Sequence, residues 1–246
     1  MANQRHLAKA PITEALVDFR AELPPASDAA ILKALAEQIR ETYPTAEPIR
    51  IFAGEIRLSP GGVSQTAAER GLLGLLCKSA DGTRIVQLRR DGFTFNKLRP
   101  YTSWNDVFAE AWRLWDLYRG AVAPGTVPRI AVRYINHINL PAGSGLDRYL
   151  VDPPTGPPEA SGSIHSYFKR VVVQDPITGH FAAVVQALEP GRDGVSQVLL
   201  LDIDVYTFTE GRNADGELRD IFLQLRQEKN RLFFGALTEE AVRMFE

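Results

Sequence analysis

The chain has 246 residues, of which 45% are hydrophobic and 24% are charged, and these shares are typical of a globular protein rather than a disordered one. The formal net charge of -2 argues against general nucleic-acid binding, which depends on a basic surface. The single cysteine, Cys77, excludes an internal disulfide and a cysteine-rich zinc site, and its apolar neighbours predict that it is buried.

The sequence shows no feature of membrane insertion. Residues 1–9 are polar and contain no apolar segment of signal-peptide length. No apolar run approaches the roughly 20 residues that a helix needs to span a bilayer. We therefore expect a cytoplasmic protein without membrane contact, whose oligomeric state the sequence leaves open.

The first half of the chain begins with a predicted strand at 11–23, in which apolar and polar residues alternate. A helix is expected from Ser27 or Asp28 to about Tyr43. The short turns Ala80-Asp81-Gly82 and Asp91-Gly92 favour antiparallel pairing of the strands on either side of them. Those strands are expected at 49–58, 72–79, 83–90 and 92–99, and the polar segment 59–70 is expected to be a surface loop.

An aromatic helix is predicted from Ser103 to Gly120, with Trp104 and Trp115 on its buried face. Trp112 lies away from the centre of that face and is followed by Arg113. Because Trp and Arg are over-represented at protein interfaces, we expect Trp112 and Arg113 to contact a partner. The alternative is that Trp112 packs beneath the segment 59–70.

The second half begins with a strand of the same length and the same proline ending as the first, at 128–140. The leucine-rich start of a later strand predicts an interior position with both faces buried. The other predicted elements are a turn or short helix near 146–150, a loop at 152–162, strands at 164–174, 180–188 and 197–208, a helix at 215–231 and a last helix capped by Thr238.

The order of these elements, β-α-β-β-β-β-α and then β-(α)-β-β-β-α, predicts an α+β fold built from a duplicated unit. The halves would be residues 1–124 and 125–246, joined into one compact unit. We expect a curved antiparallel sheet with the helices packed on one face, as in TATA-binding-protein-like and helix-grip-like folds. Such folds leave a sheet face or a sheet–helix cavity for a partner, although a fold does not determine an activity.

Six segments together resemble an uncharacterised protein family of about this length, which is distributed sporadically among bacteria and archaea. The resemblance implies a complete prokaryotic protein that acts as an accessory to a variable gene neighbourhood. It brings no established catalytic residue, substrate or cofactor. The segments are KAPITEA (9–15), RDGFTF (90–95), PYTSW (100–104), RYIN (133–136), LDID (201–204) and KNRLFF (229–234).

A polar sheet face provides the predicted ligand-binding site. Arg133 and His137 lie on one face of the strand at 128–140, and Asp202, Asp204 and Tyr206 lie on one face of the strand at 197–208. If these strands are neighbours, the five side chains converge. The alternative is a cross-strand charge ladder of Arg133 with Asp202 or Asp204, which only satisfies a polar face.

Three functions are compatible with the sequence. The first is a non-catalytic binding or accessory protein that acts with a protein partner, has a small-ligand pocket between sheet and helices, and needs no metal or cofactor. The second is a metal-dependent, hydrolase-like enzyme using Asp202, Asp204 and His137, although no HxH or HExxH spacing supports a metal.

The third function is binding of RNA or single-stranded DNA through the basic and aromatic segment 84–101, whose arginines could hold phosphates and whose rings could stack on bases. The residues concerned are Arg84, Arg89, Arg90, Phe93, Phe95, Lys97, Arg99 and Tyr101. No phosphate loop and no GxSxG nucleophile motif is present, so the sequence favours the first function.

Overall fold

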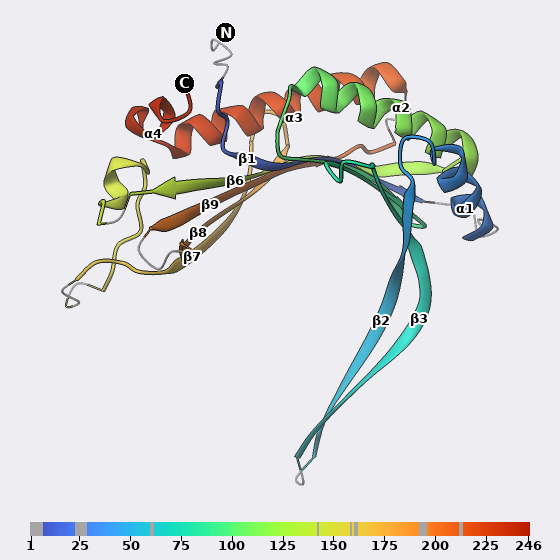
Figure 1. The fold of residues 1–246 in the computed structure, drawn as a ribbon, viewed down its shortest axis with the longest axis horizontal. Coiled ribbons are helices and arrows are strands. Elements are labelled where there is room, and N and C mark those ends of the chain that lie inside the picture. The colour runs from blue at the N-terminus through green and yellow to red at the C-terminus, as the bar shows by residue number, and fades with distance from the viewer. Residues whose placement is uncertain are drawn as a thin grey trace.

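The computed structural model describes residues 7–22, 29–59, 62–141, 143–157, 159, 162–191, 196–211 and 214–246, with the backbone alone for 29, 52–59 and 62–70. Within these ranges nine strands form one antiparallel sheet in the order β2-β3-β4-β5-β1-β6-β9-β8-β7. The sheet is curved, and the helices lie together on its convex face (Figure 1). The predicted α+β class with a large antiparallel sheet is therefore confirmed.

The bounds of most elements lie near the prediction, but the first helix ends at Gln38 rather than near Tyr43, and the strand predicted at 72–79 begins at Gly62. The strands are β1 (Ile12–Glu22), β2 (Thr45–Ser59), β3 (Gly62–Lys78), β4 (Arg84–Arg89), β5 (Gly92–Leu98), β6 (Thr126–Leu140), β7 (Tyr167–Gln174), β8 (Phe181–Pro190) and β9 (Gln197–Phe208). The helices are α1 (Ala29–Gln38), α2 (Trp104–Val122), α3 (Asp215–Ala236) and α4 (Glu239–Arg243), with a 3-10 turn at Leu146–Arg148.

Strands β1 and β6 pair at the centre of the sheet, with Val17 opposite Val132. Strands β2 to β5 extend the sheet on the β1 side, and β7 to β9 extend it on the β6 side. On each side the last strand, β5 or β9, returns to pair with the first. Strand β9 is interior, as predicted, and Leu199, Leu201 and Ile203 on its core face are fully buried, whereas Leu200 on the other face is only half-buried.

The core lies between the sheet and the helices. Phe19 of β1 is fully buried and stacks on Trp115 of α2, with ring centres 4.2 Å apart. Phe222 of α3 approaches the same Phe19 ring at 4.9 Å. An ion pair between Arg119 and Asp215 links α2 to α3 at the surface. The two long helices therefore share one aromatic core over β1.

The segment 59–70 differs from the prediction of a surface loop. Residues from Gly62 onward belong to β3 and pair with β2 in one register from Ser59 opposite Gly62 to Phe52 opposite Glu69, beyond which the register shifts twice. The paired strands extend away from the rest of the sheet as a two-stranded arm (Figure 1). The polar sequence concealed this strand, because strands that pair with each other outside the core need no apolar face to satisfy their backbone hydrogen bonds.

Cys77 has no exposed surface, as its apolar surroundings predicted, and burial raises the pKa of its thiol to about 11. The thiol is therefore protonated at neutral pH and is a poor nucleophile. In the described part of the chain, no helix is long and apolar enough to cross a membrane.

Candidate functional site

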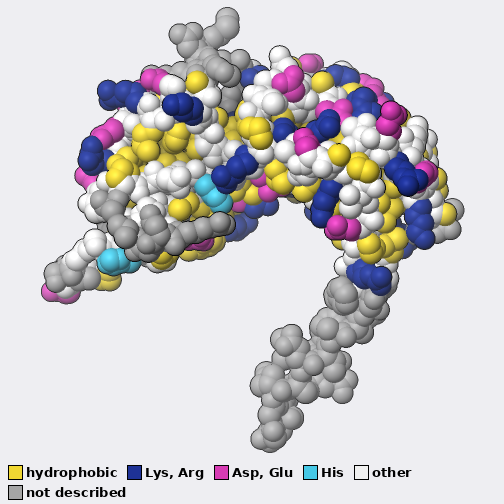
Figure 2. Space-filling model, viewed as in Figure 1, with side chains coloured by type: hydrophobic (Ala, Val, Ile, Leu, Met, Phe, Trp, Pro, Cys, Tyr) yellow, Lys and Arg dark blue, Asp and Glu magenta, His cyan; other side chains and the backbone are white. Residues whose placement is uncertain are grey.

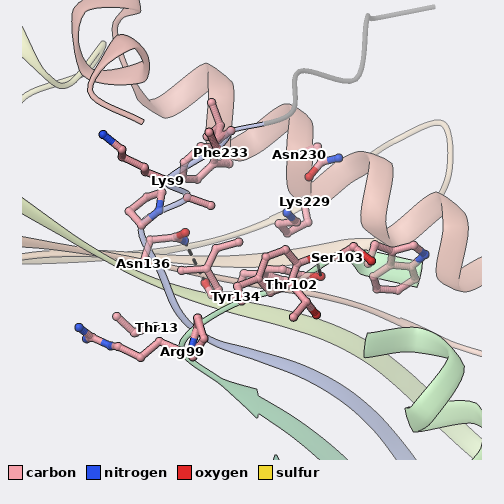
Figure 3. Close-up of a pocket in the computed structure, with 18 of the residues that line it drawn as sticks. Lys9, Thr13, Arg99, Thr102, Ser103, Tyr134, Asn136, Lys229, Asn230 and Phe233 are labelled. Carbon is pink, nitrogen blue, oxygen red and sulfur yellow. Dashed lines mark hydrogen bonds between the residues drawn. The ribbon is translucent and has the colours of Figure 1, made fainter. Parts of the chain in front are cut away.

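A cavity of about 490 Å³ lies between α3 and the sheet, beside the chain that leads into β1 (Figure 3). Four separate parts of the chain line it: the segment 7–13, the β5–α2 connection, β6 and the second half of α3. Its volume falls in the usual range for small-molecule sites. We call this cavity the end pocket.

The segments that carry the family resemblance are concentrated around the end pocket. Residues of 9–15, 100–104, 133–136 and 229–234 all contribute to its lining, although they are far apart in the sequence. Tertiary structure brings them together because β1 pairs with β6 and α3 crosses above both strands. Four of the six segments therefore meet at the end pocket, whereas 90–95 and 201–204 do not line it.

Backbone hydrogen bonds fix the wall formed by the N-terminal segment. The amide of His137 donates to the carbonyl of Pro11 at 3.0 Å, and the amide of Lys9 donates to the carbonyl of Phe245 at 2.9 Å. The hydroxyl of Thr13 donates to the carbonyl of Ile135 at 3.1 Å. This segment is thus attached both to β6 and to the C-terminal end of the chain.

The β5–α2 connection forms a second wall. Ser103 caps α2, because its hydroxyl accepts a hydrogen bond from the amide of Asp106 at 3.2 Å. This fixes the preceding Tyr101, whose hydroxyl lies 3.3 Å from the hydroxyl of Tyr134 on β6. Burial raises the pKa of both phenols, so both are protonated at neutral pH.

Lys229 is the unusual residue of the pocket. Its side chain is only 8% exposed, and its Nζ lies 3.9 Å from the centre of the Tyr134 ring. It makes no hydrogen bond or ion pair with any residue that the structure describes. Burial, together with the neighbouring charge of Arg226, lowers the pKa of this amine to about 7.

Asn136 presents a second buried polar group in the pocket wall. It is 1% exposed, and its Nδ2 donates to the carbonyls of Leu201 at 2.9 Å and Tyr134 at 3.3 Å. Its Oδ1 has no hydrogen-bond partner among the described atoms. An acceptor that is buried and unpaired costs free energy, and a donor group on a ligand or water would remove that cost.

The pocket is electrically one-sided. Four cationic side chains line it, and no Asp or Glu appears among the lining residues that the structure describes. They are Lys9, Arg99, Arg226 and Lys229, and His137 lies at the same pocket. Lys229 is buried and Arg226 is half-buried, whereas Lys9 and Arg99 are exposed and extend away from Lys229 (Figure 3). The arrangement is suited to a small anion.

The five residues predicted as a ligand-binding site are divided between two places. His137 is exposed and lines the end pocket. Arg133 forms a bidentate ion pair with Asp202, in which Nε donates to Oδ1 at 2.8 Å and Nη2 donates to Oδ2 at 2.5 Å. Asp204 pairs instead with Arg129 at 3.2 Å.

These ion pairs belong to a network on the sheet face that the helices leave open. Arg129 also lies over the ring of Tyr206, 4.3 Å from its centre, and contacts Asp18 at 3.2 Å. Figure 2 shows positive and negative side chains together along the concave margin of the molecule. These ion pairs form a cross-strand charge ladder, the alternative predicted for this face, and the ladder extends over several strands.

The metal-site arrangement of Asp202, Asp204 and His137 is not formed. His137 lies opposite Leu200 in the sheet register, whereas Asp202 lies opposite Ile135. Among the described residues, no three His, Cys, Asp or Glu side chains are grouped so that they could hold a metal ion. The carboxylate of Asp202 is engaged by Arg133 instead.

Trp112 does not lie at a surface, which corrects the expectation that it contacts a partner. It is 3% exposed, because α3 covers this side of α2 and places the guanidinium of Arg219 4.0 Å from the Trp112 ring centre. The neighbouring Arg113 is half-exposed and pairs with Glu110 at 2.8 Å. Its contact with a partner stays a prediction.

The basic and aromatic segment 84–101 does not form one surface. Phe93 and Phe95 are buried in the core and cannot stack on bases. Arg89 is also buried, and pairs with Asp18 on the open face at 3.2 Å. Arg99 and Tyr101, at the C-terminal end of the segment, line the end pocket instead.

Taken together, fold and pocket define an α+β protein with one large antiparallel sheet and a cationic cavity at the end of its central strands. Comparison with protein-family models and with curated proteins gives no match, which agrees with a resemblance to a family without an established function. A solved structure of DynU16, a protein of the dynemicin biosynthetic locus, aligns over 95% of each chain at 13% identity, with a TM-score of 0.22. A TM-score this low supports no argument about fold or function.

Proposed function

We propose that the protein is a non-catalytic, cytoplasmic binding protein that holds a small anionic ligand in the end pocket and acts as an accessory to another protein. The observation that carries the proposal is the lining of the pocket, where four cations meet no described carboxylate. Arg226 and Lys229 are the two of these side chains that the fold shields from solvent, and a shielded cation without a counter-charge is costly unless an anion neutralises it.

The shape of the lining also limits the ligand. Tyr101, Trp104 and Phe233 supply apolar surface beside the cations. The cavity of about 490 Å³ accommodates a molecule of metabolite size. We therefore expect an anionic head, either carboxylate or phosphate, joined to a short apolar or planar body.

Thermal denaturation at constant ionic strength tests this proposal. The probes are inorganic phosphate, pyruvate and succinate, each titrated against chloride. Because a ligand that binds only the folded state stabilises it in proportion to the logarithm of its concentration, at least one probe should raise Tm progressively. The variant Arg226→Gln/Lys229→Met should lose this increase.

The matched control is Arg40→Gln, which removes an exposed arginine whose partner is the neighbouring Glu37. This variant should keep the full response to the same anion. If wild type, pocket variant and control respond alike, the stabilisation is a general salt effect and the proposal is wrong.

We also propose that the two halves, 1–124 and 125–246, are copies of one unit with a TATA-binding-protein-like or helix-grip-like arrangement. The order β3-β4-β5-β1 on one side of the sheet centre matches β7-β8-β9-β6 on the other. Superposition of these four strands in an experimental structure should also bring α2 onto α3. Failure of the helices to coincide would contradict the duplication.

The edge strand β7 favours the second part of the function, contact with a protein partner. Among the described strands it pairs only with β8, at the end of the sheet. Phe168 is 70% exposed, and the three valines at 171–173 are each more than 40% exposed. An exposed, apolar edge strand is a template for pairing with a strand of another chain.

Purification of the tagged protein at low salt, followed by mass spectrometry, tests this contact. The variant Val172→Lys should lose a stoichiometric partner that the wild type retains, because a charge on the edge opposes strand pairing. Leu223→Lys, at an exposed apolar position on α3, is the matched control and should keep it. An identical set of proteins with both variants would contradict a β7 interface.

A further inference from the structure

Lys229 differs from the other buried lysine in what surrounds its amine. Lys97 is 9% exposed, and its Nζ donates to the hydroxyl of Thr83 at 3.0 Å. Lys229 is equally buried, yet no described residue accepts a hydrogen bond from it. A lysine that only filled space at this helix position would be less stable than leucine or methionine, because burying an amine without a partner costs free energy.

The position of Lys229 directs its amine to the end pocket. It lies on the stripe of α3 that faces the sheet, four residues after Leu225 and four before Phe233, both of which are buried. The pocket lies beside this stripe, and Figure 3 shows Lys229 among the lining residues, near Tyr134. The amine is thus shielded from bulk water but open to a ligand in the cavity.

We propose that Lys229 forms a reversible Schiff base with a small ligand that carries both an aldehyde or ketone and an anionic group, such as a 2-oxo acid. This inference rests on the proposed anion pocket and names the chemistry of its ligand. Arg99 and Arg226 would hold the anionic group, and Lys229 would meet the carbonyl carbon.

The reaction needs no oxidant or reductant. The lone pair of the neutral Nζ attacks the carbonyl carbon, a C–N bond forms, and the carbonyl π electrons move to oxygen, which takes up a proton. The nitrogen releases one proton to give a carbinolamine. Cleavage of its C–O bond, with a proton added to the departing oxygen, releases water and leaves the iminium, and hydrolysis reverses every step.

The surroundings of Lys229 favour this reaction. The lowered pKa of its amine leaves a substantial neutral fraction at neutral pH, as in other lysines activated by burial and a nearby cation. The hydroxyls of Tyr101 and Tyr134, 3.3 Å apart, lie in the same pocket and can pass a proton to or from the carbinolamine oxygen.

Trapping with sodium cyanoborohydride tests the proposal in the full-length protein. The reductant delivers hydride to the iminium carbon and converts it to a stable secondary amine, which peptide mass mapping locates. The probes are pyruvate and acetone at equal concentration, so that only one carries a negative charge. We expect pyruvate to label Lys229 at least ten-fold faster than acetone, and faster than it labels any exposed lysine.

Two variants separate nucleophile from charge. Lys229→Arg keeps the cation but has no reactive amine, so the pocket adduct should disappear while Lys169→Arg leaves it unchanged. Burial is the larger cause of the lowered pKa of Lys229 and the charge of Arg226 is the smaller one, so Arg226→Gln should move half-maximal labelling to higher pH. The other charged or titratable groups at the pocket, unchanged in that variant, are Lys9, Arg99, Tyr101, Tyr134 and His137.

The outcomes distinguish this inference from the proposed function. Stabilisation by pyruvate without any adduct at Lys229 would overturn the Schiff base and leave the anion pocket standing. Absence of both the stabilisation and the adduct would overturn both. Peptide mapping of the wild type alone decides the question even if Lys229→Arg fails to fold.

Discussion

At the scale of single residues, the cost of burying Lys229 makes stability depend on pH. Its pKa is lowered from 10.5 to about 7 in the folded protein, so between these values the unfolded chain binds a proton that the folded chain does not. Stability from this residue therefore rises with pH across that window, by at most about 1.4 kcal/mol per pH unit.

Urea unfolding at a series of pH values from 7 to 9.5 checks this prediction. The unfolding free energy of the wild type should increase relative to that of Lys229→Met, by roughly 1–3 kcal/mol across the range. The methionine variant is the control because it keeps the length of the side chain without the charge. Parallel curves for the two proteins would show that the amine titrates normally.

Asp18 is the carboxylate on which the open-face network depends. Its oxygens accept hydrogen bonds from Arg89 and Arg129, each at 3.2 Å, and from the hydroxyl of Thr94 at 2.6 Å. Replacing Asp18 by Asn removes one of the two carboxylates that each arginine contacts, because Arg89 keeps Asp91 and Arg129 keeps Asp204. We therefore expect a loss of roughly 1–3 kcal/mol of unfolding free energy.

The control for this prediction is Arg40→Gln, because Arg40 lies outside the network. Its guanidinium contacts Glu37 at 3.0 Å and both side chains are mostly exposed, so its loss should cost less than about 1 kcal/mol. Chemical denaturation measures both values. Equal losses in the two variants would mean that the network contributes through surface charge alone.

Residue-scale prediction from sequence succeeded on the sheet and failed on α3. Alternation along the strand at 197–208 placed Asp202 and Asp204 on one face, with Arg133 nearby, as the structure has them. Lys229 could have been found by extending the stripe of Leu218, Phe222 and Leu225 by one more turn. Its charge and its polar neighbours made it resemble a solvent-exposed residue instead.

At the scale of elements, the turn between β4 and β5 requires glycine. Gly92 has a φ of 145°, and a Cβ there would lie 2.2 Å from the carbonyl oxygen of Phe19. The backbone of the central strand β1 cannot move aside to make room for a Cβ atom. Gly92→Ala should therefore lower the unfolding free energy by more than about 2 kcal/mol.

Gly120 provides the comparison for that substitution. It lies inside α2, and no atom lies within 4 Å of the place that a methyl group would take, so Gly120→Ala should be neutral or stabilise the protein by about 0.5–1 kcal/mol. Thermal denaturation of both variants measures the difference. Similar effects at the two positions would contradict the close approach of Gly92 to β1.

Elements with a buried face were predictable, and the arrangement of elements against each other was not. Periodicity identified α2 and its face containing Trp104 and Trp115, both of which are buried. It could not reveal that α3 lies alongside α2 and covers Trp112, because helix–helix packing depends on residues about 100 positions later in the chain. The strand within 59–70 was missed because its polar sequence lacks the alternation that a half-buried strand requires.

At the scale of the whole molecule, the arm formed by the outer parts of β2 and β3 is separate from the sheet that carries the pocket. The carbonyl of Leu73 accepts the last hydrogen bond from the β4 side, from the amide of Arg90 at 2.8 Å, and from Leu72 to Gly62 the described residues of β3 pair with β2 alone. Joining Ala53 to Ala68, which are register partners, through an Asn-Gly turn should preserve the fold.

We expect the unfolding free energy of this shortened protein to lie within about 1 kcal/mol of the wild-type value, because an isolated two-stranded ribbon contributes little stability. Its Tm response to anions should also be unchanged. Urea unfolding and the anion titration provide these two values. A large loss of either would show that the arm supports the core or the pocket.

The pocket itself could not be predicted from the sequence. Its walls come from the chain before β1, the β5–α2 connection, β6 and α3, and each wall contributes only a few residues. The segments that carry the family resemblance did mark four of these walls, but only the fold shows that they meet. His137 was predicted to join Asp202 and Asp204 on the polar sheet face, and it lies on β6 at the edge of the end pocket.

Anomalous diffraction from a crystal soaked in selenate shows whether the end pocket is an anion site. We predict a selenium peak within the cavity, in contact with the guanidinium groups of Arg99 or Arg226, and its loss in Arg226→Gln/Lys229→Met. Selenium peaks found only on the outer surface, with the cavity empty, would contradict an anion site in the end pocket.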